Sequence, residues 1–244
     1  MAPQRPDRPE DPAAAGAQAP QGRVTWGFTA SLDGFIAGPE HDMAWLEACP
    51  PMDGEVVARL AEPVGVIISG RRGYDAAVAQ AAERGELTSE AYGGAWGGVE
   101  IVLTHRPEEL AGDPSVTALD VDVAEAIRRA HELADGKDVQ IISADIARQA
   151  LELDLVDELQ IFSAPVMLGD GTRAFSVPGG RRIDWELVGS IPGAEAGFGR
   201  LYRPRGTAGS GAAAGSSGAG WTGTARLPRG EPGRGPRSRW LSGR

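Results

Sequence analysis

Along this chain, segments whose apolar residues have the spacing of a β-strand alternate with segments whose apolar residues have the spacing of a helix. Short runs rich in Val, Ile and Leu predict buried strands at residues 24–30, 64–69, 100–104, 116–119 and 139–142. Helical spacing follows at 53–61 and 123–134. Residues 184–190 and 198–202, joined through Pro192-Gly193, predict an antiparallel hairpin. Strands that alternate with helices before such a hairpin predict an α/β domain with a mainly parallel sheet.

The stretch 138–175 combines these signals in one unit. After the strand at 139–142, Ser143 stands where a helix N-cap belongs, and apolar residues then recur at helical spacing. A second apolar run, 156–168, ends in the turn Gly169-Asp170-Gly171. Strand, turn, helix and strand form a βαβ unit, whose first turn exposes helix N–H groups that can bind an anion such as a nucleotide phosphate. A crossover helix without a ligand is the alternative.

Composition divides the 244 residues into one domain and two tails. Residues 1–22 are rich in Pro, Ala and charge, and residues 206–244 in Gly, Ala, Ser and Arg, with no apolar period in either. Neither tail can bury enough surface to offset chain entropy, so we expect both to be disordered and residues 23–205 to form the domain. Of the net charge of −10, the tails carry −1 and +5, which leaves −14 on the domain. An acidic domain argues against a nucleic-acid partner.

Cysteine usage and hydropathy narrow the class of protein further. Cys49 is the only cysteine, so we expect neither an intrachain disulfide nor a cysteine-based metal site, and we predict no bound metal. No apolar run approaches the length of a membrane span, and the N-terminus lacks the apolar segment of a secretion signal. We therefore expect no membrane partner and a cytoplasmic protein.

Three predicted strands end in turns that could meet at one edge of the sheet, where ligands of open α/β sheets bind. Gly70-Arg71-Arg72 offers a close backbone approach and two guanidinium groups for a phosphate. Thr104-His105-Arg106 offers three donors, and the third turn is the helix start Ser143-Ala144-Asp145-Ile146. Taken singly, the arginines are more typical of a solvated helix start and His105 of an exposed loop. Together the turns predict a phosphorylated nucleotide ligand, and Arg with Thr-His suits a 2′-phosphate.

The order of these motifs resembles the dihydrofolate reductase superfamily. SLDGFIAG, GRRGYD, IVLTHRP, IISADIARQAL and LVDELQIFSAPVMLGDGTRAF follow one another over residues 24–203. Within the superfamily they are most similar to the C-terminal reductase domain of the bacterial riboflavin-biosynthesis deaminase–reductase. The resemblance implies a three-layer α/β/α fold with a mostly parallel central sheet and an antiparallel C-terminal hairpin. It also implies an NADPH-dependent reductase of pteridine- or aminopyrimidine-like small molecules, similar to 5-amino-6-(5-phosphoribosylamino)uracil reductase, and a homodimer that pairs through an apolar sheet edge near 156–168.

The resemblance further implies that three turns and one loop hold NADPH. The Gly-Arg turn would contact the 2′-phosphate and the pyrophosphate, and the Thr-His strand end would flank the adenosine phosphate. The helix start would admit the pyrophosphate, and an N-terminal loop would hold the nicotinamide amide. In that order the matching residues are Gly70, Arg71, Arg72, Thr104, His105, Ser143, Ala144, Asp145, Ile146, Ile36 and Ala37.

Two positions depart from the family's pattern. Gly73 replaces a phosphate-contacting Thr, and Ser143-Ala144 replaces Gly-Gly or Gly-Ala, which adds a Cβ and a hydroxyl where the backbone approaches phosphate. Ser143 could compensate as a donor, or it could cap the helix. Loss of one charge-assisted contact costs roughly 1.5–3 kcal/mol, so we expect weakened rather than absent coenzyme binding. A dinucleotide- or flavin-binding protein of the same fold with weak or no reductase activity is the alternative.

Asp33 and Asp42 are the acidic candidates for catalysis near the expected hydride site. A carboxylate there could hold an aminopyrimidine through its N–H donors or relay a proton. For Asp33 an ordinary Asp-Gly turn explains the sequence equally well. Asp33, Trp45 and Gly169 are the residues that the resemblance places beside the substrate. Packing explains the tryptophans better than stacking on a ligand ring does: Trp26, Trp45 and Trp96.

Overall fold

The computed structural model describes residues 21–205 except 50, 84–90 and 195–198. The tails predicted at 1–22 and 206–244 lie outside the described residues, apart from Gln21 and Gly22. In chain order the elements are β1 (Val24–Ala30), β2 (Phe35–Ala37), α1 (Gly54–Ala61), β3 (Val64–Gly70), α2 (Arg71–Glu83), β4 (Val99–Leu103), β5 (Val116–Leu119), α3 (Val123–Leu133), β6 (Asp138–Ile141), α4 (Ala144–Glu152), β7 (Glu158–Ser163), β8 (Thr172–Arg173), β9 (Trp185–Ser190) and β10 (Arg200–Pro204). Short 3₁₀ helices lie in the connections: η1 (Pro39–His41), η2 (Ala44–Ala48), η3 (Ala91–Gly94) and η4 (Pro107–Leu110).

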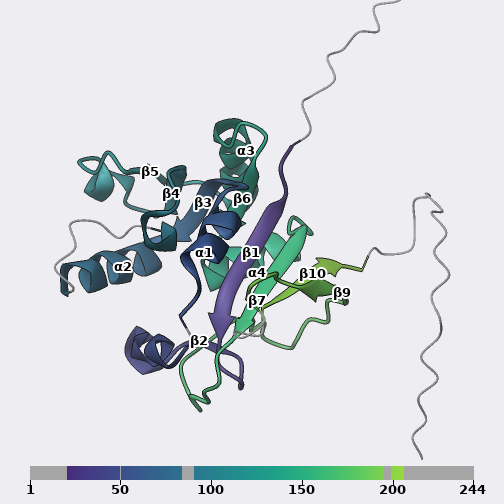
Figure 1. Ribbon diagram of the computed structural model, residues 1–244. Helices are drawn as coiled ribbons and strands as arrows, with labels where there is room; N and C mark the ends of the chain where they lie inside the picture. Colours follow the sequence, from purple (N-terminus) through teal and green to yellow (C-terminus); the bar gives the residue numbers. More distant parts are fainter. Residues whose placement is uncertain (1–20, 50, 84–90, 195–198, 206–244) are drawn as a thin grey trace, which may run out of the picture. The chain divides into compact units, whose positions relative to one another are not determined.

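The central sheet has the strand order β5-β4-β3-β6-β1-β7-β10-β9, with β1 between β6 and β7 (Figure 1). β1 pairs in parallel with β6 and β7, and β3 with β4 and β6, whereas β10 pairs antiparallel with both β7 and β9. Strand β3 is buried on both faces, with Val66, Ile67 and Ile68 only 0–1% exposed, which is why its sequence is a continuous apolar run. This is the predicted dihydrofolate reductase-like arrangement, a mostly parallel sheet with an antiparallel C-terminal hairpin.

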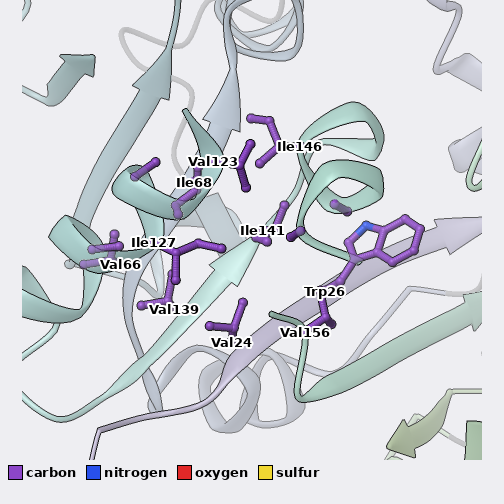
Figure 2. Close-up of a cluster of buried hydrophobic side chains, with 14 of the residues drawn as sticks. Val24, Trp26, Val66, Ile68, Val123, Ile127, Val139, Ile141, Ile146 and Val156 are labelled. Carbon is purple, nitrogen blue, oxygen red and sulfur yellow. The ribbon is translucent and has the colours of Figure 1, made fainter. Parts of the chain in front are cut away.

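The main hydrophobic core lies between one face of the sheet and helices α3 and α4. Figure 2 shows Val123, Ile127 and Ile146 of these helices against strand residues Val24, Trp26, Val66, Ile68, Val139 and Ile141. The helical residues recur at i, i+4 spacing within each helix, so each helix buries one apolar stripe. Burial of Ile146, which is 5% exposed, fixes the first turn of α4 against the sheet.

Helices α1 and α2 cover the opposite face of the sheet. Successive side chains of a strand point to opposite faces. Ile101 of β4 belongs to the main core, whereas its neighbour Val102 packs with Tyr74 of α2. In the same way Phe162 of β7 packs with Val56 of α1. The sheet therefore lies between two helical layers, as the three-layer prediction requires.

Two sequence predictions about these segments are wrong, and one strand pairing was missed. Helix α2 begins at Arg71 directly after β3, so residues 70–74 are not a turn. Strand β7 ends at Ser163 and lies between β1 and β10, so residues 156–168 do not form a sheet edge; the edge strands are β5 and β9. The segment after β1 contains β2, which pairs with β8 in a ribbon that the sequence did not predict. Among the helices described, none is both long enough and apolar enough to cross a bilayer.

Candidate functional site

The strand order places a topological switch point between β3 and β6. From β3 the chain continues through α2 to β4 on one side, and from β6 it continues through α4 to β7 on the other. Because β3 and β6 are parallel neighbours, their carboxyl ends lie side by side. In open α/β sheets, ligands bind outside the carboxyl ends of the strands at such a point. Two of the three predicted phosphate-binding turns therefore lie where topology favours a ligand.

Gly70 and Ser143 lie against each other at this switch point. A Cβ on Gly70 would be 3.1 Å from Ser143 Oγ and 3.6 Å from Ile146 Cδ1, so the absence of a side chain at Gly70 allows the two strand ends to pack closely. Ser143 has the extended backbone of an N-cap, but its side chain makes no capping hydrogen bond. Asp53 and Asp122, by contrast, do cap α1 and α3. Of the two roles left open for Ser143, the structure does not show capping, and its hydroxyl faces Gly70.

The first turn of α4 offers backbone donors at the same place. Asp145 lies in this turn, but its carboxylate accepts hydrogen bonds from Arg148 (2.9 Å) and Gln149 (2.8 Å) farther along the helix. The bond from Arg148, the bond from Gln149 and the charge of nearby Arg72 hold the pKa of Asp145 below its usual range. With neither Ser143 nor Asp145 capping the helix, the N–H groups at its start can be satisfied by an anion.

The carboxyl ends of β3 and β4 carry a linked set of ion pairs. Arg71, the first residue of α2, binds Asp75 through Nε at 2.8 Å and Glu109 through Nη1 at 2.9 Å. Glu109 also binds Arg106, whose Nη1 lies 2.8 Å from Glu109 Oε1. The hydrogen bond to Asp75, followed by that to Glu109, raises the pKa of Arg71. Arg71, the residue predicted to bind the 2′-phosphate, is therefore already paired with two carboxylates.

Thr104 and His105 lie in the segment after β4, just before Arg106 and Glu109. Thr104 Oγ1 accepts a hydrogen bond from Arg106 N at 3.1 Å, which shapes the turn after β4. The side chain of His105 is 98% exposed, and its Nδ1 lies 3.0 Å from Asp120 Oδ1. The structure thus brings Arg71 and residues 104–109 together through Glu109. The sequence analysis missed Glu109, and no motif marks it.

At the end of β1, Asp33 joins two loops. Its carboxylate accepts hydrogen bonds from Ser31 Oγ (2.6 Å), Leu168 N (3.1 Å) and Gly169 N (2.7 Å). These bonds, that of Ser31 first, lower the pKa of Asp33 to about 2. Asp33 is therefore an anion throughout the neutral range and carries no proton to relay. Its geometry is that of a residue that positions the loop after β1 against the turn at 168–171, while contact of Asp33 or Gly169 with a substrate stays a prediction.

The β2–β8 ribbon holds the predicted nicotinamide loop. Ala37 pairs with Thr172 and is buried, and Ile36 packs against the main core. Gly171 makes the pairing possible, because it has φ of 130° and a Cβ there would lie 2.1 Å from the carbonyl oxygen of Ala37. Arg173 of β8 stacks its guanidinium 4.4 Å above the ring of Phe35. The glycine-rich motif after β7 therefore serves a close backbone contact that sequence alone did not reveal.

Asp42 and Trp45, the remaining predicted site residues, follow β2. Asp42 is exposed, and its Oδ1 accepts a hydrogen bond from Ala44 N at 3.0 Å. Trp45 is buried in η2, and its Nε1 has no hydrogen-bond partner within the described part of the chain. A buried N–H without a partner costs free energy, so this indole is a donor that a ligand could satisfy. In the ranges that the structure describes, no hydrogen bond links either residue to Asp33.

A cavity of about 610 Å³ lies at the opposite ends of the strands, beside the amino ends of β1 and β6. Its lining includes Arg23, Arg59, Lys137 and Asp138. Arg23 is bound to Asp138 at 3.0 Å and to Glu158 at 2.5 Å, so it ties the start of β1 to its neighbours. Because ligands of such sheets bind at the carboxyl ends of the strands, we do not place the candidate site in this cavity.

Comparison with known proteins agrees with this description. The sequence profile of the RibD C-terminal domain matches residues 23–195. A candidate riboflavin biosynthesis protein of Shewanella sp. PV-4 superposes with a TM-score of 0.58 at 19% identity, covering 75% of this chain and 99% of that one. Dihydrofolate reductase of Enterococcus faecalis complexed with NADP(H), and a pyrimidine reductase-like protein of Corynebacterium diphtheriae, each give a TM-score of 0.49 at 14% identity, covering 77% and 75% of this chain and 99% and 92% of theirs. Among curated proteins no match was found.

The profile spans β1 to the end of β9, and so includes every strand end described above. The Shewanella structure shows the same fold over nearly its whole length. Family and topology therefore agree on a reductase-type fold. The chain belongs to the RibD C-terminal domain family.

Proposed function

We propose that the protein is an NADPH-dependent reductase that transfers a hydride to a pteridine- or aminopyrimidine-like small molecule, as 5-amino-6-(5-phosphoribosylamino)uracil reductase does. The observation that carries the proposal is the switch point between β3 and β6. There the backbone of Gly70, which carries no Cβ, lies against the hydroxyl of Ser143 and beside the uncapped start of α4. Membership in the RibD C-terminal domain family supports a reductase over other users of this topology.

The residues at the switch point fit the phosphates of a dinucleotide. Gly70 leaves the strand end free of a Cβ, and the N-terminus of α4 favours negative charge. Ser143 adds a hydroxyl donor, and Arg71 and Arg72 bring guanidinium groups to the start of α2. NADPH would supply the hydride. The residues of the chain would bind its phosphates and fix its position.

The ribbon of β2 and β8 is suited to orienting the nicotinamide end. Ile36 is held by the main core and Ala37 by its pairing with Thr172. Backbone groups that are fixed in this way can position an amide without losing conformational entropy on binding. In this proposal Ile36 and Ala37 orient the reactive ring, and the adjacent turn at Gly169 borders the substrate.

Asp33 would act on the substrate side as a fixed anion. Oδ1 accepts hydrogen bonds from Ser31 and Leu168, whereas Oδ2 accepts the one from Gly169 N. A carboxylate oxygen has two lone pairs, so Oδ2 can accept a further hydrogen bond from an N–H of an aminopyrimidine. The low pKa of Asp33 supports recognition of the substrate over donation of a proton to it.

A second candidate function is dinucleotide or flavin binding with weak or no reduction. The observation that favours it is Gly73, which leaves the first turn of α2 without the hydroxyl donor that the family usually has. A Cβ at Gly73 meets nothing within 4 Å, so a larger side chain can be introduced. Gly73→Thr combined with Ser143→Gly should tighten NADPH binding markedly if these departures weaken the site. Unchanged affinity would count against this second candidate.

Titration of the purified protein with NADPH, followed by its fluorescence, tests the main proposal. We expect saturable binding below millimolar NADPH and a loss of at least about tenfold in affinity for Gly70→Ala, since the added methyl group would lie 3.1 Å from Ser143 Oγ and displace that hydroxyl. Gly112→Ala is the matched control, because a Cβ there meets nothing within 4 Å. Absence of binding at millimolar NADPH would contradict the proposal.

A further inference from the structure

Glu109 occupies the position of an anion between two guanidinium groups. Its Oε2 lies 2.9 Å from Arg71 Nη1, and its Oε1 lies 2.8 Å from Arg106 Nη1. Arg71 starts α2 after β3, and Arg106 precedes η4 after β4, so the carboxylate bridges two neighbouring strand ends. Guanidinium groups bind carboxylate and phosphate oxygens with the same geometry. Glu109 therefore takes the contacts that a phosphate would make with these two arginines.

The surrounding charge is already balanced. Arg71 binds Asp75 as well as Glu109, and His105 lies against Asp120. A phosphate monoester carries about −1.5 to −2 charges at pH 7. To reach Arg71, it must displace Glu109 or lie beside its negative charge, and either event offsets the attraction of the arginine. The side chains of Arg71, Glu109 and Arg106 are 27%, 36% and 70% exposed, so solvent screens this competition in part, and least at Arg71.

A carboxylate at this place also has a favourable partner in a coenzyme without the phosphate. In dinucleotide-binding sites an acidic residue accepts a hydrogen bond from the ribose 2′-hydroxyl, whereas an arginine accommodates the 2′-phosphate. Here the arginine, Arg71, and the acidic residue, Glu109, are bound to each other. The 2′-phosphate of NADPH therefore does not gain the full contact with Arg71, and the 2′-hydroxyl of NADH does not gain the full contact with Glu109. The geometry therefore predicts little discrimination between them.

We propose that Glu109 is a built-in substitute for the 2′-phosphate and that it sets the coenzyme selectivity of the site. With Glu109 bound to Arg71 and Arg106, the protein accepts NADH as well as NADPH. Removal of the carboxylate charge frees both arginines for a 2′-phosphate. This inference rests on the proposed function and assigns specificity at the same site to a residue outside its motifs.

The chain offers a matched control in Glu108. Glu108 precedes Glu109 in η4 and is exposed, and it forms no ion pair within the ranges that the structure describes. Glu108→Gln therefore removes the same charge from the same short helix without releasing Arg71. An effect on binding that comes only from the loss of one negative charge is expected in both variants. An effect that comes from breaking the ion pairs with the two arginines is expected in Glu109→Gln alone.

The test measures binding of two adenosine fragments, adenosine 2′,5′-bisphosphate and adenosine 5′-monophosphate, by calorimetry at fixed ionic strength. We expect wild-type protein to discriminate between them less than about threefold. Glu109→Gln should bind the bisphosphate at least about tenfold more tightly, equivalent to 1.4 kcal/mol, with affinity for the monophosphate nearly unchanged. Glu108→Gln should behave as wild type. Glu109→Gln combined with Arg71→Gln should lose the gain, and NADPH and NADH should follow the two fragments.

Three results would overturn the inference. The first is a wild-type preference of tenfold or more for the bisphosphate, and the second is an equal response of the Glu108 and Glu109 variants. The third is an equal gain for both fragments in Glu109→Gln. Thermal melting of each variant, with Glu109→Ala as a second substitution, shows that the fold is kept. If no variant binds either fragment, NADPH or NADH, the proposed function fails together with the inference, and this outcome differs from the other three.

Discussion

Replacement of Gly171 by alanine tests whether the β2–β8 ribbon organises the substrate side. Gly171 has φ of 130°, where L residues are rarely found, and strain of this kind costs of order 1–3 kcal/mol. A Cβ would also lie 2.1 Å from Ala37 O and 2.8 Å from Gly38 Cα. Both contacts are with backbone, so they can be relieved only by moving β2 away from β8. We expect Gly171→Ala to lower the free energy of unfolding by about 3 kcal/mol, from strain and lost pairing together.

Gly169→Ala is the matched control two residues earlier. Gly169 also has a positive φ, 78°, but a Cβ there meets nothing within 4 Å. Only the left-handed backbone is penalised, by about 1 kcal/mol. In a domain of this size, 1 kcal/mol shifts the melting temperature by about 2–4 °C, so we expect losses of about 6–12 °C for Gly171→Ala and about 2–4 °C for the control.

Thermal unfolding and amide hydrogen exchange together measure this difference. Exchange at Phe35–Ala37 should accelerate in Gly171→Ala and not in Gly169→Ala, because only the first substitution separates β2 from β8. Equal melting temperatures for the two variants, or unchanged exchange at β2 in Gly171→Ala, would refute the reasoning.

Three further predictions concern charge and assembly. Asp33 has its pKa lowered to about 2 from 3.8, so its bonds stabilise the fold fully above about pH 5 and are lost as the pH falls through about 2. Asp33→Asn should therefore melt lower than wild type at pH 7, and the difference should shrink as the pH is lowered to about 2. Glu158 is 2% exposed and holds Arg23, so Glu158→Gln should lower the urea midpoint by an amount equivalent to about 1.5–3 kcal/mol, while exposed Glu186→Gln should not. We also propose a homodimer, which would have to use a strand other than internal β7, and light scattering of a monomer at micromolar concentration would exclude it.

Much of the fold follows from local sequence. The continuous apolar run at 64–69 predicted a strand buried on both faces, and β3 is such a strand. Asp53 was expected at the start of a helix and caps α1. The turn expected after this strand was wrong, because Gly70 is the last residue of β3 and Gly73 lies within the first turn of α2, where glycine costs only about 0.5–1 kcal/mol relative to alanine.

Long-range contacts explain what the sequence could not predict. The β2–β8 ribbon joins strands of three and two residues that are far apart in the chain, too short for any apolar period. The contact between Arg71 and Glu109 spans 38 residues and depends on how η4 packs beside α2. For Ser143 the sequence allowed both capping and ligand donation, and only the structure shows a hydroxyl without a capping bond. Motif order therefore pointed to the switch point between β3 and β6 but not to Glu109, which is bound to Arg71 there.

Amide hydrogen exchange with and without NADPH tests most directly whether a coenzyme binds at the switch point between β3 and β6. If the account is right, saturating NADPH slows exchange at residues 70–72 and 143–147 more than anywhere else in the domain, because the phosphates engage the start of α2 and the start of α4. Unchanged exchange at both segments under saturating NADPH, or protection confined to the cavity at the start of β1, would contradict it.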